Sequence, residues 1–394
     1  MMNQNRNSTL NALLLCLTLC LILGVLAQVD VLRTTLRPIL YISWLVLILV
    51  YIIIYRHQIL VSKQAQVLAL MAGMIFLWRI LLMILGVMDN LPQLGTLVLI
   101  DLAAFLYGTW MAGHDVGDKW LARVMICYSL AVGLFAAYLL RTYFPSIGAW
   151  LSSVVYQYSA KNSAAQLLVQ AALFMFFLYP TAQIKTPAAI GQMIRYGVLG
   201  ISLIMIALLR CRTAMLALAV CALYYIFRWG GRKRYVYIGT LLLLGFAVIT
   251  IEPLKEFIES ALLLNKYGQN ATLDEFSSGR LSYIDVAFDT WLEHFWLGAG
   301  RIMVDCNPLA LLADSGILGA VPYYIFWLST VKLNILREAT NNSFNQVVQL
   351  LTVYYCVTAC LEGYPPFGPG VCVAPMWLLS GYCEIKFEKA DDIT

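Results

Sequence analysis

The N-terminal stretch from residue 10 to residue 29, LNALLLCLTLCLILGVLAQV, contains no charged residue. A helix of about 20 apolar residues spans the ~30 Å hydrocarbon core of a bilayer. The apolar part of a cleaved signal peptide has only about 7–15 residues, and here a second apolar run follows almost at once. The stretch therefore predicts the first transmembrane helix of a membrane protein.

The composition of the whole chain supports the same class. Of 394 residues, 61% are hydrophobic and 12% are charged, and the mean hydropathy is +0.79. A soluble globular protein has about 45–50% apolar and about 25% charged residues. Apolar segments lie at 10–29, 38–55, 65–88, 94–113, 121–140, 164–180, 196–209, 213–229, 235–251, 309–330, 345–361 and 370–385. We expect an all-α polytopic integral membrane protein with about twelve transmembrane helices.

The distribution of basic residues predicts the orientation. With both termini in the cytoplasm, 15 of the 26 Lys and Arg residues lie inside and 10 outside, while Arg79 lies within a helix. If only short loops are counted, as the positive-inside rule requires, the ratio becomes 15 to 6. We therefore expect cytoplasmic termini and an outward-facing loop between the ninth and tenth helices.

That loop, residues 252–308, separates transmembrane helices 1–9 (residues 1–251) from helices 10–12 and a cytoplasmic tail (residues 309–394). Apolar residues at helical spacing predict an amphipathic helix from Leu254 to Leu262 and a second helix from Leu281 to Phe295. On the second helix Asp285, Asp289 and Glu293 share one face. This acidic face is either solvated or a wall that binds sugar.

The basic residues, cysteines and histidines argue against nucleic-acid binding and against a metal site. The basic residues are scattered singly, which argues against nucleic acid as a partner. Most cysteines lie inside apolar runs, none has CxxC spacing, and the chain has only three histidines. We expect no metal site and no cofactor.

Arg79 and Asp101 are the clearest charges within predicted helices. Their distances from the predicted outer helix ends place them at similar depths. We expect a structural ion pair between them, because an unpaired charge inside a membrane is costly. A substrate or proton pathway is the alternative.

Arg210 and Arg212 lie at the outer junction of the seventh and eighth predicted helices. Residues two apart do not share a helix face, so at most one points directly into a shared cavity. Each arginine either extends to lipid headgroups or belongs to a clamp for a diphosphate, whose oxygens suit bidentate guanidinium donors. Arg280 in the long loop is a candidate for the same clamp.

The end of the loop carries further polar candidates. Gly298 and Gly300 permit a tight turn before Arg301, and Asp305 and Asn307 precede the tenth predicted helix. Asp305 and Asn307 either cap this helix or contribute a catalytic carboxylate and its neighbour.

Four patches of the chain resemble the O-antigen ligase and O-antigen polymerase superfamily of bacterial membrane enzymes. They are Lys161-Asn162, Arg212-Thr213-Ala214, Ser278-Gly279-Arg280, and the stretch from Gly298-Ala299-Gly300 to Asp314-Ser315-Gly316-Ile317-Leu318-Gly319. The resemblance implies a metal-independent, inverting glycosyltransferase of the polytopic GT-C type. It also implies donor and acceptor glycans on undecaprenyl diphosphate, at the periplasmic face of the bacterial inner membrane.

By this resemblance Arg212 and Arg280 would bind the diphosphate, and Asp305 matches an aspartate that some polymerases carry near this point. Apart from this resemblance, we expect Lys161, Arg210, Asp285, Arg301 and Asn307 to contact substrate. The ligases have a His-Asn pair where this chain has Cys306-Asn307. A thiol is a poor proton acceptor compared with imidazole, so the polymerase branch is favoured.

As partners we expect membrane lipids and a chain-length regulator in addition to the lipid-linked glycans. Two other functions stay open. A ligase would transfer finished glycan to a lipid or protein acceptor, and a flippase or transporter would move the lipid-linked glycan between leaflets. The sequence shows no repeat of the kind from which many transporter folds are built.

Overall fold

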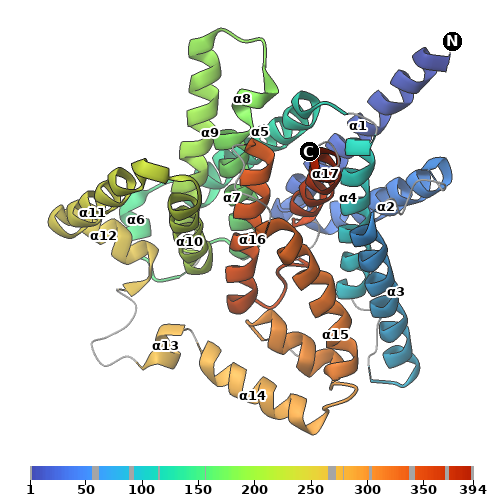
Figure 1. The fold of residues 1–394 in the computed structure, drawn as a ribbon. Coiled ribbons are helices and arrows are strands. Elements are labelled where there is room, and N and C mark those ends of the chain that lie inside the picture. Colours follow the sequence, from blue (N-terminus) through green and yellow to red (C-terminus); the bar gives the residue numbers. More distant parts are fainter. Residues whose placement is uncertain are drawn as a thin grey trace.

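The computed structural model describes residues 2–55, 62–87, 93–113, 116–155, 157–264, 272–277, 279–300, 304–336, 342–368 and 372–391. Every regular element in these ranges is a helix (Figure 1). Arg301 lies outside the described residues. The all-helical architecture expected from the sequence is confirmed for the part of the chain described.

Each of the twelve predicted apolar segments overlaps one long helix. These helices are α1 (Met2–Leu26), α2 (Asp30–Tyr55), α3 (Lys63–Ile84), α4 (Gln93–Gly113), α5 (Asp118–Tyr143), α7 (Lys161–Phe177), α9 (Ala188–Leu208), α10 (Arg212–Trp229), α11 (Arg234–Thr250), α15 (Asn307–Ile335), α16 (Ser343–Leu361) and α17 (Ala374–Asp391). Short helices α6 (Ile147–Ser152), α8 (Tyr179–Ala182) and η1 (Gly231–Lys233) lie between them.

Six stretches in the described ranges are long and apolar enough to cross a membrane. They are α3, α5, α9, η1 with α11, α15 and α16. None of the residues of α11 is buried, and its leucine side chains are exposed. In water such a surface would be costly, whereas lipid solvates it. The chain is therefore an integral membrane protein that crosses the bilayer several times.

The long loop folds into three helices: α12 (Glu252–Ala261), α13 (Leu273–Ser277) and α14 (Arg280–Glu293). The two helices predicted from apolar spacing are confirmed as α12 and α14. Figure 1 shows α13 and α14 along the lower edge of the bundle, whereas the N and C ends are marked in its upper half. The acidic residues predicted on one face of α14, Asp285, Asp289 and Glu293, are all exposed.

The densest packing joins α4 to α17. A Cβ atom on Gly108 would lie 2.0 Å from the carbonyl oxygen of Leu378, and one on Gly381 would lie 2.0 Å from that of Phe105. Small residues let the two backbones approach closely, as in other membrane helix pairs. The C-terminal helix therefore lies in the core, where Trp377 is fully buried.

Helix α15 breaks at Gly316, where the backbone has φ 64° and ψ 178°. The break frees backbone groups that the segment 295–300 then pairs. Ala299 N–H donates to the carbonyl of Ala313 at 2.8 Å, Gly300 N–H donates to that of Asp314 at 3.1 Å, and Ile317 N–H donates to that of Phe295 at 2.9 Å. The broken helix thus fixes the last part of the long loop against the bundle.

Arg79 on α3 pairs with Asp314 on α15, next to this break. Its Nε also donates to the hydroxyl of Tyr323 at 3.2 Å, and the Arg79 side chain is only 1% exposed. The prediction that Arg79 pairs with Asp101 is wrong: Asp101 is buried, and its Oδ2 has no hydrogen-bond partner among the described residues. Depth along two helices is readable from sequence, but the direction in which each side chain points depends on helix packing.

We expect Gly298→Ala to lower stability, because the added Cβ would lie 2.4 Å from the nitrogen of Gly316 and the residue has φ +77°. Such local strain costs about 1–3 kcal/mol. Thermal unfolding in detergent measures the effect. Gly197→Ala in α9 is the control, since nothing lies within 4 Å of its Cβ position. Equal melting temperatures for the two variants would contradict the role given to the break.

We also expect Arg79→Ala to destabilise the fold strongly, because it leaves Asp314 buried without its cation. Breaking a buried pair costs about 3–5 kcal/mol, whereas replacing both partners by apolar residues is often neutral. The double variant Arg79→Met with Asp314→Leu should therefore melt well above Arg79→Ala. If the double variant melts no higher, the charge pair is not what the single substitution disturbs.

Candidate functional site

Helix α14 begins with a capping network that fixes Arg280 at its first turn. Ser277 Oγ accepts hydrogen bonds from the backbone N–H groups of Arg280 at 3.1 Å and Leu281 at 3.4 Å. Asp274 accepts from the N–H of Ser282 at 3.0 Å and from its hydroxyl at 2.5 Å. The Ser282 hydrogen bonds hold the pKa of Asp274 below its usual value. The helix start therefore presents Arg280 in a defined position.

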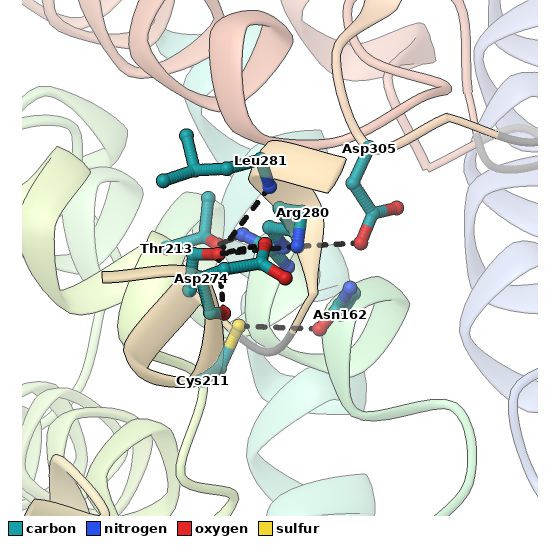
Figure 2. A network of polar contacts seen from close by, with 8 residues as sticks. Asn162, Cys211, Thr213, Asp274, Arg280, Leu281 and Asp305 are labelled. Atoms are coloured by element: carbon teal, nitrogen blue, oxygen red, sulfur yellow. Dashed lines mark hydrogen bonds and ion pairs between the residues drawn. The ribbon is translucent and has the colours of Figure 1, made fainter. Parts of the chain in front are cut away.

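Arg280 joins its own helix α14 to α10 and to the segment before α15 (Figure 2). Its Nε donates to Asp305 Oδ2 at 3.0 Å, just before α15, and its Nη1 donates to Thr213 Oγ1 at 3.3 Å, in the first turn of α10. The Arg280 side chain remains 26% exposed. The guanidinium is thus oriented by the protein while part of it stays accessible.

Two further cations belong to this cluster. Arg212 begins α10 beside Thr213, and Lys161 begins α7. The Cys211 thiol donates to Asn162 Oδ1 at 3.5 Å and so joins the starts of these helices. Burial lowers the pKa of Lys161 to about 8, and the charges of Arg212 and Arg280 act in the same direction. The structure thus brings together Lys161, Arg212, Arg280 and Asp305, all selected from the sequence.

Glu362 is a member of the site that sequence reasoning missed. It follows α16, is only 6% exposed, and lies near Thr213, which favours its charged form. Burial raises its pKa to about 7, although nearby Arg280 and Lys161 favour its charged form. A signal existed: Glu362 is the only acidic residue between Ser343 and Cys383, and it ends an apolar run.

Arg210, which the sequence analysis places among the substrate contacts, lies against α6 in the structure. Its side chain is buried and donates to the carbonyls of Ser153 and Trp150, the latter at 2.5 Å. Its guanidinium also lies 4.5 Å from the centroid of the Trp150 ring. Arg210 has φ +51°, so the chain turns sharply before α10. The turn directs Arg210 towards α6 and away from Thr213 and Arg280.

The structure also gives the positions of Asn307 and Asp285, two other predicted substrate contacts. The Asn307 amide is buried and donates to the carbonyl of Gly363 at 2.8 Å, which fixes the backbone beside Glu362. This hydrogen bond therefore stabilises the backbone next to the site. Asp285 is exposed, and five residues of helix rotate it away from the side occupied by Arg280. Burial raises the pKa of the Cys306 thiol, so this residue stays neutral and cannot replace a histidine base.

The raised pKa of Glu362 predicts a pH-dependent stability. Because the folded-state value is about 7 and the ordinary value is 4.5, wild-type stability should fall as the pH rises from about 4.5 to 7. The loss is at most about 3 kcal/mol. In Glu362→Gln this contribution should vanish, whereas the exposed control Glu256→Gln should keep it. Melting temperatures between pH 4.5 and 8 test this, and parallel curves for wild type and Glu362→Gln would refute it.

Comparison with known proteins agrees with this geometry. No curated protein matches the chain. Residues 197–310, however, match the family model Wzy_C, described as O-antigen ligase. The matched region runs from α9 into α15 and includes Arg212, Arg280 and Asp305. Over this region the chain is therefore similar to the O-antigen ligase family.

Proposed function

We propose that this protein polymerises oligosaccharide repeat units carried on undecaprenyl diphosphate. The observation that supports this function is the convergence of Lys161, Arg212 and Arg280, from three separate stretches of chain, at one end of the helix bundle. Arginine is suited to bind phosphate oxygens, because its planar guanidinium offers paired donors and stays charged at any physiological pH.

The arrangement favours an anionic ligand with more than one phosphate. Two carboxylates, Asp305 and Glu362, lie among three cations, and Glu362 is close to half protonated near neutral pH. The cluster therefore carries excess positive charge at the end of a membrane protein. Asp305 accepts from Arg280 Nε and Thr213 accepts from its Nη1, so we assign phosphate binding to the accessible part of the side chain, which is 26% exposed.

In the proposed reaction an acceptor hydroxyl attacks the anomeric carbon of the donor glycan. The new glycosidic bond forms as the bond between that carbon and the diphosphate oxygen breaks, with inversion. The electron pair leaves with the lipid diphosphate, and Arg212, Arg280 and Lys161 stabilise the growing negative charge. Asp305 orients Arg280 and the incoming acceptor. In this scheme the cations act on the leaving group directly, and no metal is required.

The proposed topology has twelve crossings in a GT-C-like arrangement, with the loop of residues 252–308 on the periplasmic side of the inner membrane and both termini in the cytoplasm. The opposite placement of α14 and the chain ends in Figure 1 supports it. The lipid-linked glycans and membrane lipids are the proposed partners. A chain-length regulator would contact the same outer face.

A ligase activity is the second candidate, and the description of the matched family as O-antigen ligase favours it. The two activities differ in acceptor only. Cells that lack a polymerase retain glycan of single repeat units on the surface. Cells that lack a ligase accumulate free lipid-linked polymer and attach none.

We expect Arg280→Ala to abolish chain extension without loss of the protein from the membrane, because the diphosphate loses its oriented cation. Removal of one such charged donor costs about 10²–10³-fold in rate. Glycan ladders from cells that carry each variant give the measurement. Arg234→Ala is the control, since Arg234 is an exposed residue that begins α11. Ladders of normal length from Arg280→Ala would exclude Arg280 from the reaction.

A further inference from the structure

Glu362 is a buried carboxylate directly beside the proposed diphosphate site. It is contributed by the segment after α16, which the match to the O-antigen ligase family does not cover. The side chain is 6% exposed, and Asn307 fixes the adjacent backbone through the carbonyl of Gly363. Burying a carboxylate lowers the stability of the fold, so we ask which function its position would serve.

Charged and titratable groups from every neighbouring element face this carboxylate. Lys161 comes from α7, Arg280 from α14 and Asp305 from the segment before α15. Thr213 of α10 also favours its charged form. Cys211 and the α16 residues Tyr354 and Tyr355 also interact with it electrostatically. Thr213 in turn accepts a hydrogen bond from the guanidinium that would hold the diphosphate, so Glu362 and this guanidinium share a neighbour.

We propose that Glu362 is the catalytic base that accepts the proton of the acceptor hydroxyl. This role rests on the glycosyl transfer proposed above. The hydroxyl oxygen forms the bond to the anomeric carbon, its proton moves to a carboxylate oxygen of Glu362, and the lipid diphosphate leaves with the electron pair. Glu362 later releases the proton to solvent, so atoms and charge balance over the cycle.

The other candidates at the site are less suited to this step. Asp305 is occupied by Arg280 Nε at 3.0 Å, and its side chain is 53% exposed, so it serves better to orient the arginine. The Cys306 thiol is held neutral by burial. Glu362 has a pKa of about 7, and a base of that strength is half deprotonated at neutral pH and still able to take a proton.

Protonation of Glu362 during the reaction would also help the diphosphate to leave. In the ground state the Glu362 carboxylate competes with the diphosphate for Lys161 and Arg280. When Glu362 takes the proton, its negative charge disappears at the moment when the leaving diphosphate gains one. Lys161 and Arg280 can then act on the diphosphate alone, so the site stabilises the transition state more than the bound substrate.

The experiment uses the purified full-length protein in detergent with undecaprenyl-diphosphate-linked repeat units. Chain extension is measured from pH 5 to 9 for wild type, Glu362→Gln, Glu362→Asp and the exposed control Glu256→Gln. Binding of undecaprenyl diphosphate is measured separately on each variant. Arg280→Ala is included as the variant that tests the diphosphate site itself.

For wild type we expect the rate to rise as the pH passes about 7 and to fall above about 8, where Lys161 loses its charge. Glu362→Gln should lose about 10²–10⁴-fold in rate and the acidic limb of the profile, yet bind the lipid diphosphate at least as tightly as wild type does. Glu362→Asp should recover part of the rate. Glu256→Gln should match wild type.

Two results would overturn the assignment while the proposed function stands. Glu362→Gln could keep the wild-type rate and pH profile although Arg280→Ala is inactive, which would place the base elsewhere. Alternatively, Glu362→Gln could lose rate and lipid binding together, which would show that Glu362 only positions the cations. If wild type extends no chain, and Arg280→Ala binds the lipid diphosphate normally, the proposed function fails and the role of Glu362 fails with it.

Discussion

The ion pair between Arg79 and Asp314 is the interaction on which the geometry of the site depends. It joins α3 to α15 beside the break at Gly316, where the freed carbonyls of Ala313 and Asp314 hold the segment 298–300. Asp305, farther along the chain, accepts a hydrogen bond from Arg280. A buried pair is expensive to desolvate but very costly to break, so it fixes one arrangement of these elements. The position of segment 298–300, near the end of the loop, therefore depends on charges buried elsewhere in the chain.

At the site itself positive and negative side chains lie close together. Arg212 and Arg280 disfavour the charged form of Lys161, and burial favours the neutral form of Glu362. A polyanion bound at the proposed site would reduce the repulsion between these cations. Contacts away from the charged groups hold these side chains in place. Asp274 caps the start of α14, and Asn307 donates a hydrogen bond to the carbonyl of Gly363. The same features explain why α14 can be exposed along most of its length and still hold its first residue in place.

The corrections to the sequence-based expectations share one physical origin. Arg210 and Arg212 are chemically identical and two residues apart, yet the left-handed turn at Arg210 sends one side chain against Trp150 and leaves the other near Lys161. Asp101 has the depth expected of a partner for Arg79, but α15 presents Asp314 instead. Asn307 has the chemistry of a substrate ligand, and packing turns its amide towards Gly363. In each case residue type and depth were readable, whereas the direction of the side chain was decided by a neighbouring helix.

The sequence by itself determined the class of protein and the position of nearly every helix, because apolar length and helical spacing are local properties that a bilayer enforces on each segment separately. It also identified Arg212, Arg280 and Asp305 as chemically apt for phosphate and proton transfer, since the identity of a side chain does not depend on folding. The tertiary structure alone decided which charges meet. It brought Glu362 to Arg280 over a separation of more than 80 residues and assigned Asp314 to Arg79. Such pairings depend on how helices pack against one another, and no local pattern in the chain encodes that.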